Sequence, residues 1–421
     1  MLTFDVYIII AALSSLVILS YVFSLISSKT RVPTVIMLLA LGIGIRELLI
    51  SLDSYRVMPM NVIQFFGVLG LILILLEAGL DLKISRKKLP LVGNAAASSL
   101  FVLSLSVLGI GAIVHYMLGQ AWDISFIYAV PLAVISSTIV ASSIDYLSQD
   151  KREFLTYESS LSDIIGILLF NFLIAKQAFD VGVLAINILS IVLAILVSIA
   201  ISVMLVMVLA KAKIKVKAFL IFAVLLLIYS VGHLWDLPAL LVVLIFGLII
   251  NNWRQIKIHG IDRLLPIESV ETAADSIKSV TTESAFLVRT FFFTLFGYTI
   301  DITTLRDPKV LIVGGIIVFV IFLIRFVYLR IFSSDHILPE LFFAPRGLVT
   351  IVLFYSIPAH LSFGTFDEGV LFYVILLTTL IMMFGSIWFT PKDATRESEE
   401  RAQLRLSRAR KIARLGMGKK L

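Results

Sequence analysis

The chain has 421 residues, of which 60% are hydrophobic and 15% are charged, and its mean hydropathy is +1.06. Soluble proteins contain about 45–50% apolar and 25% charged residues, so this composition excludes a soluble enzyme, a secreted domain and a disordered protein. Cysteine is absent, which excludes disulfides, thiolate metal sites and a cysteine nucleophile. The net charge of +7 does not indicate a nucleic-acid partner, because membrane proteins concentrate Lys and Arg on one side.

Thirteen segments of the chain are apolar over the length that a helix needs to cross the hydrocarbon of a bilayer, which is about 20 residues. They predict an all-α polytopic membrane protein with about 13 transmembrane helices, numbered here as spans one to thirteen. Because 237–252 is short, twelve or fourteen spans remain possible. The spans cover residues 4–27, 32–50, 61–80, 89–118, 125–147, 157–178, 180–211, 216–234, 237–252, 278–302, 309–332, 341–360 and 368–390.

The Lys and Arg residues are distributed unequally between the two sides of this arrangement. The connections on one side hold 17 of the 35 Lys and Arg residues, and those on the other side hold four. Because cytoplasmic connections are enriched in these residues, the N-terminus is predicted outside and the C-terminus in the cytoplasm. The expected location is a cell membrane, the bacterial inner membrane. Residues 391–421 are predicted to be a short, basic, solvated cytoplasmic tail, with an amphipathic helix on anionic lipid as the alternative.

Two stretches at the ends of spans three and ten resemble each other. Each has an Asp between apolar residues and an Arg five residues later, Asp81 with Arg86 and Asp301 with Arg306. A shift of seven spans gives the two copies opposite orientations, so spans 1–6 and 8–13 are predicted to be inverted repeats, an arrangement typical of transporters. Chance similarity of two helix ends is the alternative.

Several charged residues stand inside the spans, where a charge is costly unless it has a partner or a function. Arg46, Arg289 and Glu340 are near span ends, and their side chains are expected to extend to the membrane surface. Glu77, at the inner end of span three, is either a helix-end residue or a buried hydrogen-bond acceptor.

Span six carries two acids that point in different directions. Glu158 and Ser162 are four residues apart on one helix face, and Asp163 lies about 100° around the helix from Ser162. Asp163 precedes a long apolar sequence, and a lone carboxylate there, near hydroxyl side chains, suits a hard monovalent cation or a proton. Neutralisation by a buried Arg is the alternative for Asp163 and the favoured interpretation for Glu158.

Spans five and twelve, which correspond in the two halves, both contain helix-breaking sequences. Span five has Pro131 followed by the hydroxyl residues 136–138, and span twelve has Pro345, Arg346 and Gly347. Proline and glycine interrupt helices, and matching interrupted spans indicate a binding site near the midplane, where the broken helices cross. An Arg in such a break is expected to satisfy exposed carbonyls. Kinked helices without a ligand are the alternative.

Together these residues resemble the monovalent cation:proton antiporter superfamily, the sodium/proton exchangers. The sixth-span motif of that family has Glu-Ser, then Asn-Asp or Asp-Asp, then an apolar run ending in Tyr/Phe-Asn. Here the motif is Glu158-Ser159 through Asp163, followed by Phe170-Asn171. Similarities that are weaker individually extend over residues 1–390 and include 76–80 in span three, 136–138 in span five, 324–326 in span eleven and 345–348 in span twelve.

The resemblance implies a homodimer in membrane lipid, with no nucleic-acid partner. Residues 1–390 would form the antiporter domain, with a scaffold of spans 1–3 and 8–10 and a mobile core of spans 4–6 and 11–13. Such a protein is a secondary active antiporter of a monovalent cation and H⁺ and contains no cofactor.

The resemblance also implies the ion site. A proton and a monovalent cation, with Na⁺ as the first expectation and Li⁺ or K⁺ as others, would compete for the carboxylate of Asp163. Further oxygens are expected from Ser137, Thr138 and the neighbouring Ser162. Ser162 stands where the family has Asn or Asp, and because serine does not titrate, one carboxylate remains to carry one ion. Electroneutral exchange is therefore predicted, while this departure leaves the ion selectivity open.

The remaining charges are assigned structural roles by the resemblance. Arg325 falls where the family keeps the eleventh-span Arg that pairs with the Glu of the sixth span, so it is expected to hold Glu158 in an ion pair. Arg346 is expected to fill the break in span twelve, and it is the alternative partner for Glu158.

Three other functions are weighed against this one. A potassium/proton antiporter or a Kef-like potassium efflux protein shares the membrane fold, although the second type normally adds a large cytosolic domain that residues 391–421 are too short to form. A channel predicts current without coupled proton movement. A membrane enzyme is not expected, because the five histidines are scattered near span ends.

Overall fold

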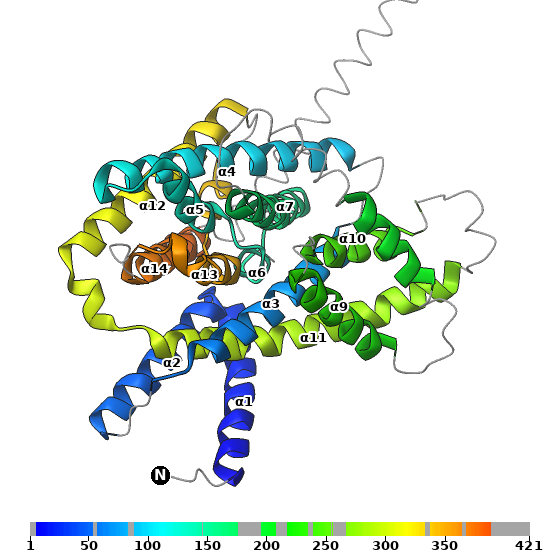
Figure 1. Cartoon of the computed structure of the whole chain (residues 1–421), viewed down its shortest axis with the longest axis horizontal. Coiled ribbons are helices and arrows are strands. Elements are labelled where there is room, and N and C mark those ends of the chain that lie inside the picture. Colours follow the sequence, from blue (N-terminus) through cyan, green and yellow to red (C-terminus); the bar gives the residue numbers. More distant parts are fainter. Residues whose placement is uncertain are drawn as a thin grey trace, which may run out of the picture.

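The computed structural model describes residues 6–53, 57–82, 88–144, 146–175, 195–207, 217–234, 239–253, 255, 267–332, 337–363 and 368–388. These residues form helices and connections, with no β-strand among them (Figure 1). The longer helices are α1 (Val6–Thr30), α2 (Thr34–Ser51), α3 (Met60–Asp81), α4 (Leu89–Leu118), α5 (Trp122–Ala133), α7 (Gln149–Ala175), α9 (Lys217–Leu234), α10 (Ala239–Asn251), α11 (Ile267–Thr299), α12 (Pro308–Phe332) and α14 (Glu368–Trp388). The short ones are α6 (Ser137–Ala141), α13 (Leu348–Tyr355), and the 3₁₀ turns η1 (Ile302–Arg306), η2 (Glu340–Phe342) and η3 (Ala359–Leu361).

The helices follow the predicted spans in chain order. Eight helices in the described part are long and apolar enough to cross a membrane, and three shorter apolar helices accompany them. Two helices begin earlier than predicted, α7 at Gln149 instead of residue 157 and α11 at Ile267 instead of residue 278. Span seven is described only over Ile195–Met207, which is helical, and the predicted tail lies outside the described residues.

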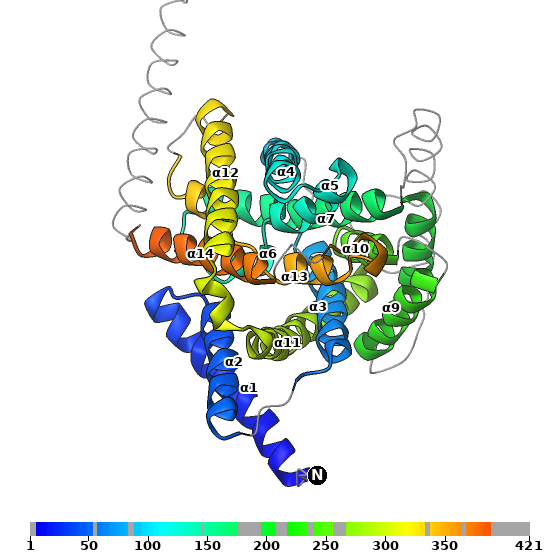
Figure 2. The same cartoon turned by 60° about the vertical axis from the view of Figure 1, so that its left-hand side comes forward.

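The helices gather in two groups that face each other (Figures 1 and 2). One group, called the bundle here, contains α4, α5, α6, α7, α12, α13 and α14, so it is built from spans 4–6 and 11–13. Within it α4 packs on α5, α7 and α12, and α12 packs on α14. The other group, called the panel, contains α1, α2, α3, α9, α10 and α11, which are spans 1–3 and 8–10. The two groups meet where α13 packs on α3.

Two helix pairs in the panel repeat the same close packing. α3 packs on α10, where Gly79 faces Gly247, and α11 packs on α2, where Gly297 faces Gly42. A Cβ atom on Gly79 would lie 2.7 Å from the carbonyl oxygen of Leu244 and 3.0 Å from the Cα of Gly247, so the approach requires glycine. The helices α3 and α10 are spans three and nine. In an inverted repeat with a shift of seven spans, span three corresponds to span ten (α11) and span nine corresponds to span two (α2). The predicted inverted repeat is confirmed.

Both predicted helix breaks are present, and they meet. α5 ends shortly after Pro131, and α6 begins only after the linker 134–136. In span twelve the chain is non-helical over 343–347, and α13 begins directly after it. The backbone N–H of Ser136 donates to the carbonyl of Pro345 at 2.9 Å. Each break therefore supplies a hydrogen-bond partner to the other, as a buried interrupted backbone requires.

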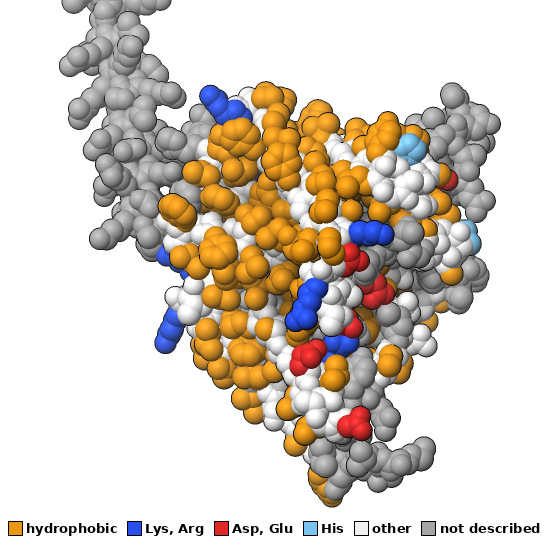
Figure 3. Space-filling model, turned by 90° about the vertical axis from the view of Figure 1, so that its left-hand side faces the viewer, with side chains coloured by type: hydrophobic (Ala, Val, Ile, Leu, Met, Phe, Trp, Pro, Cys, Tyr) orange, Lys and Arg blue, Asp and Glu red, His pale blue; other side chains and the backbone are white. Residues whose placement is uncertain are grey.

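The face of the molecule shown in Figure 3 is largely apolar. α4 and α12 expose large hydrophobic side chains, among them Phe101, Leu108, Phe319 and Phe332. On the face shown, the Lys, Arg, Asp and Glu side chains are few among continuous hydrophobic ones. Soluble monomers expose only small apolar patches, so this surface is that of a protein whose solvent is lipid.

Candidate functional site

Asp163 lies in α7 beside the linker that separates α5 from α6, and it is 1% exposed. Ser137, the first residue of α6, donates to its Oδ2 atom from both the backbone N–H, at 3.2 Å, and the hydroxyl. The other carboxylate oxygen, Oδ1, is buried without a hydrogen-bond partner, and the described residues contain no ion pair to Asp163. An unpaired buried carboxylate oxygen is costly, and this one is available to a proton or a cation.

The other two residues expected to supply oxygens lie nearby with different partners. Ser162 accepts a hydrogen bond from the backbone N–H of Ile135 at 3.0 Å, in the linker between α5 and α6. The hydroxyl of Thr138 is 3.1 Å from that of Ser136. The structure therefore brings Ser137 to the carboxylate, whereas Ser162 satisfies a backbone group that the helix break has freed.

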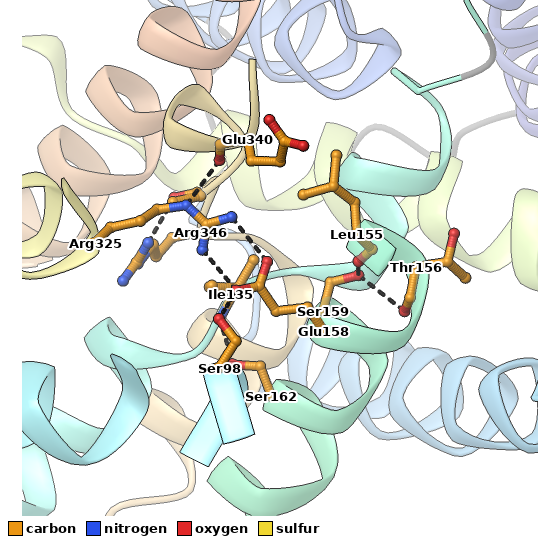
Figure 4. A network of polar contacts seen from close by, with 11 residues as sticks. Ser98, Ile135, Leu155, Thr156, Glu158, Ser159, Ser162, Arg325, Glu340 and Arg346 are labelled. Carbon is orange, nitrogen blue, oxygen red and sulfur yellow. Dashed lines mark hydrogen bonds and ion pairs between the residues drawn. The ribbon is translucent and has the colours of Figure 1, made fainter. Parts of the chain in front are cut away.

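Glu158 lies in α7 against Arg325 of α12, and both side chains are buried (Figure 4). The guanidinium binds the carboxylate with two parallel hydrogen bonds, Nη2 to Oε2 at 2.8 Å and Nη1 to Oε1 at 3.1 Å. Ser98 of α4 donates a further hydrogen bond to Oε1. Two-point Arg–carboxylate contacts are strong and fixed in geometry, so this pair joins α7 to α12, and Ser98 adds α4.

The same network continues to η2, at the start of span twelve. Arg325 donates through Nε to the carbonyl of Glu340 in η2 at 2.9 Å (Figure 4). The Glu340 carboxylate accepts from Nζ of Lys151 at 3.3 Å, and Nζ also donates to the carbonyl of Leu338 at 2.7 Å. The expectation that Glu340 extends to the membrane surface is wrong, because its side chain is largely buried and paired with the buried Lys151.

Arg346 fills the space between the two helix breaks and is fully buried. Its guanidinium donates to three carbonyls, those of Leu132 at 2.8 Å, Ala133 at 3.1 Å and Ala344 at 2.5 Å. Leu132 and Ala133 are the last residues of α5, whose carbonyls lack helical partners. Arg346 thus caps the first half of the broken span five, and among the described residues it makes no hydrogen bond or ion pair with Glu158.

Arg46 and Arg289 also have acidic partners. Arg46 lies 3.3 Å from Asp301 and 3.1 Å from Glu47, measured between side-chain nitrogen and oxygen. Arg289 of α11 lies 3.6 Å from Glu77 of α3. Both Arg side chains are thus paired with acids, which adds a partner to the expectation that they extend to the membrane surface.

A cavity of about 240 Å³ separates the panel from the bundle and reaches Ser137. It extends from the exposed Asp81 at the end of α3, past Glu77 and Arg289, to Ser137 and Thr138 at the start of α6. A second cavity, of about 170 Å³, lies at the C-terminal end of α11, between the panel and the bundle, and begins one turn beyond the α11 residues that line the first. The first cavity is therefore a route from the surface to the donor that holds Asp163.

The family is shown by a match over nearly the whole chain. A family model described as "Sodium/hydrogen exchanger, transmembrane" matches residues 13–391. The chain belongs to this family. The exchanger is thus a multi-pass membrane protein of a cation/proton antiporter family, which is a family of transporters and not of enzymes. No curated protein sequence matches it.

The fold of the exchanger is similar to that of the sodium proton antiporter MjNhaP1 from Methanocaldococcus jannaschii. A structure of that protein at pH 8 matches with a TM-score of 0.67 and 20% sequence identity, over 92% of this chain and 100% of that chain. An electron microscopy structure of it matches with a TM-score of 0.61 and 18% identity, over 93% and 97%. The predicted antiporter fold is confirmed by these matches.

Sequence reasoning missed two polar groups that support the exchanger's site. Ser98 is one of two adjacent serines in an apolar span, the same signal that marked span five. Lys151 was assigned to a connection between spans, but α7 begins at Gln149 and includes it. Lys151 precedes Glu158 by seven residues, two helical turns, so both lie on one face of the longer helix.

Proposed function

We propose that this exchanger carries out electroneutral exchange of one Na⁺ for one H⁺, with the two ions competing for Asp163. The observation that supports this most directly is that one oxygen of the Asp163 carboxylate has hydrogen-bond partners and the other has none. Ser137 holds Oδ2, and Oδ1 is buried without a partner in the described residues. A site with one free carboxylate oxygen accepts either a proton or a dehydrated cation, and binding of one excludes the other.

Coupling follows from the cost of moving a charge through a medium of low dielectric constant. A bare carboxylate that crosses between the two sides of the membrane costs several kcal/mol or more. The core therefore moves when Asp163 carries Na⁺ or H⁺ and stays in place when Asp163 is empty. The hydroxyls of Ser137 and Thr138 complete the oxygen ligands of the cation, and Ser162 keeps the neighbouring linker in place.

The moving part in this mechanism is the bundle, and the static part is the panel, in a homodimer. The cavity that reaches Ser137 lies between these two groups, where a sliding motion would open and close it. With the N-terminus outside, this cavity faces the cytoplasm, because the end of α3 and the start of α7 are then cytoplasmic. The bacterial inner membrane is the proposed location.

The test is a proton-coupled assay with purified protein in vesicles. Addition of Na⁺ to vesicles with an imposed pH gradient should move protons, and Li⁺, K⁺ and Ca²⁺ are compared under the same conditions. A response to K⁺ alone would replace the sodium assignment with the potassium/proton alternative. Asp163→Asn should remove the response to every cation, because the amide has nearly the same shape but does not bind and release a proton. Asp150→Asn, the same change at an exposed position of α7, should exchange normally.

A further inference from the structure

The charged residues that line the cavity all come from one of its walls. Glu77 and Asp81 belong to α3, and Arg289 belongs to α11, so all three are in the panel. The opposite wall, from α6 and α7, contributes uncharged residues, among them Ser137 and Thr138. A cation on its way to Ser137 therefore meets one acidic pair and one fixed positive charge.

The fixed charge of Arg289 faces the acid deepest in the cavity. Its Nη1 atom is 3.6 Å from Oε2 of Glu77, which is ion-pair contact without the short distance of a hydrogen bond. Nε of Arg289 donates to the carbonyl of Ala285 one turn earlier in α11, at 3.2 Å, which anchors the guanidinium. The two side chains are 20% and 18% exposed. The pair is thus partly solvated and loosely made, so a mobile cation is able to share Glu77 with Arg289.

We infer that Arg289 is a tethered competitor of the transported cation, which sets the affinity of the cavity for that cation by occupying Glu77. This inference rests on the proposed cation/proton exchange. With Arg289 in place, a cation entering the cavity is repelled by the guanidinium and shares Glu77 with it. Without Arg289, the carboxylate of Glu77 keeps its hydrogen bond with the Thr282 side chain but loses its paired guanidinium. The cavity then binds mobile cations more strongly.

A second pair on the same two helices provides a matched comparison. Lys278 of α11 lies 2.6 Å from Asp81 of α3, and the two side chains are 43% and 41% exposed. Exposed pairs are screened by water and salt. Removal of Lys278 should therefore change the apparent affinity for the cation less than removal of Arg289, although the change in net charge is the same.

The experiment measures the KM for Na⁺ and the maximum rate of exchange in vesicles that hold the protein in either orientation. The proteins compared are wild type, Arg289→Gln, Glu77→Gln, the double variant and Lys278→Gln. Arg289→Gln should lower KM by about two- to five-fold, the effect expected of a partly exposed charge pair, on the side to which the cavity opens. Glu77→Gln should raise KM, because it leaves Arg289 unmatched. The double variant should lie near wild type. A purely structural role of Arg289 would lower the maximum rate or the thermal stability without this pattern in KM.

Two results would overturn the inference. One is an Arg289→Gln protein with unchanged or raised KM, and the other is a lowered KM that persists when Glu77→Gln is added. If Arg289→Gln does not assemble, Glu77→Gln still decides, since an unchanged KM there shows that the pair does not tune affinity. Arg289→Lys keeps the charge and should retain a KM near wild type. Failure of the proposed exchange itself is distinct, because wild type would then show no Na⁺-dependent proton movement.

Discussion

Ser137 donates two hydrogen bonds to a single oxygen of Asp163, one from its backbone and one from its hydroxyl, and leaves the other oxygen free. The backbone donor exists because α6 begins at Ser137, and the first N–H groups of a helix have no partner within it. The break in span five thus supplies a donor to the one buried carboxylate in α7 that has no ion pair in the described residues. The two features predicted separately from sequence, the broken helix and the lone acid, form one site.

Ser137→Ala should reduce the kcat/KM of exchange by about ten-fold or more. A hydrogen bond to a charged group contributes about 1.5–3 kcal/mol, and the variant loses this donor and one expected oxygen ligand of the cation, while the backbone N–H remains. The measurement is Na⁺-dependent proton movement in vesicles. Ser142→Ala is the control, because Ser142 also lines the cavity but bonds to the carbonyl of Ile139. Equal rates in the two variants would contradict the role of Ser137.

The spans and both helix breaks were predictable because lipid imposes simple rules on sequence. A helix in hydrocarbon must be apolar over about 20 residues, and the breaks carry Pro131, Pro345 and Gly347, which no regular helix favours. The inverted repeat was visible from the short similarity around Asp81 and Asp301, and the packing of α3 on α10 and of α11 on α2 confirms it. These features depend on local sequence, so one chain is sufficient to find them.

The partners of the charged residues were less predictable, because the partners are distant in sequence. Hydropathy gives the position of Arg289 along a span, but it does not indicate that Glu77 of α3 faces it. In the same way, Lys151 and Glu340 meet across the bundle. The predicted starts of α7 and α11 are wrong because the first turns of both helices are polar and precede the apolar segment that hydropathy detects. Among the ion pairs, only the Glu158–Arg325 contact was expected, and that expectation came from family resemblance.

Glu158 and Arg325 should show strong energetic coupling in a double-mutant cycle. Removal of one partner leaves the other charge buried, at a cost of about 3–5 kcal/mol, whereas removal of both leaves no stranded charge. Glu158→Gln and Arg325→Gln should each lower the thermal stability in detergent strongly, and the double variant should lose less than the sum of the two.

The comparison pair for this cycle is Lys88 and Glu153, which joins the start of α4 to α7. Their side-chain atoms are 2.8 Å apart, but the side chains are 37% and 21% exposed. The hydrogen bond that Lys88 donates to the Glu153 carboxylate holds the pKa of Lys88 above its usual value. Because exposed pairs contribute about 0–1 kcal/mol, the cycle at this pair should show little coupling. Coupling of similar size at both pairs would contradict the assignment of the first as a buried structural pair.

Gly166→Ala should slow exchange by about ten-fold or more while the protein still assembles. A Cβ atom on Gly166 of α7 would collide with the side chain of Val134, which is fully buried in the linker before α6. Overpacking of this kind costs about 1–3 kcal/mol, and here it displaces the linker that places Ser137. Gly93→Ala in α4 is the control, because nothing lies within 4 Å of the added atom. Val134→Ala in the Gly166→Ala background should restore much of the rate, and a failure to do so would place the defect elsewhere.

Turnover should carry no net charge across the membrane, because one titratable group is available in the site. Asp163 is the single carboxylate there, Ser162 does not titrate, and Glu158 is held by two hydrogen bonds from Arg325 and one from Ser98. One Na⁺ therefore replaces one H⁺. If Glu158 released its partner and carried a proton in each cycle, a second charge would move and transport would generate a membrane potential.

Electrophysiology on a solid-supported membrane separates these two cases. Wild type should give Na⁺-driven proton movement in the vesicle assay but no sustained Na⁺-driven current, and a current that scales with the transport rate would refute one-for-one exchange. Ser162→Asp offers the converse comparison, since it adds a second carboxylate beside Asp163. In wild type the Ser162 hydroxyl accepts a hydrogen bond from the backbone N–H of Ile135. The new carboxylate can accept that hydrogen bond too, unless its side chain turns away from the linker. The variant is thus expected either to gain a current or to lose transport, and the wild-type measurement decides the stoichiometry.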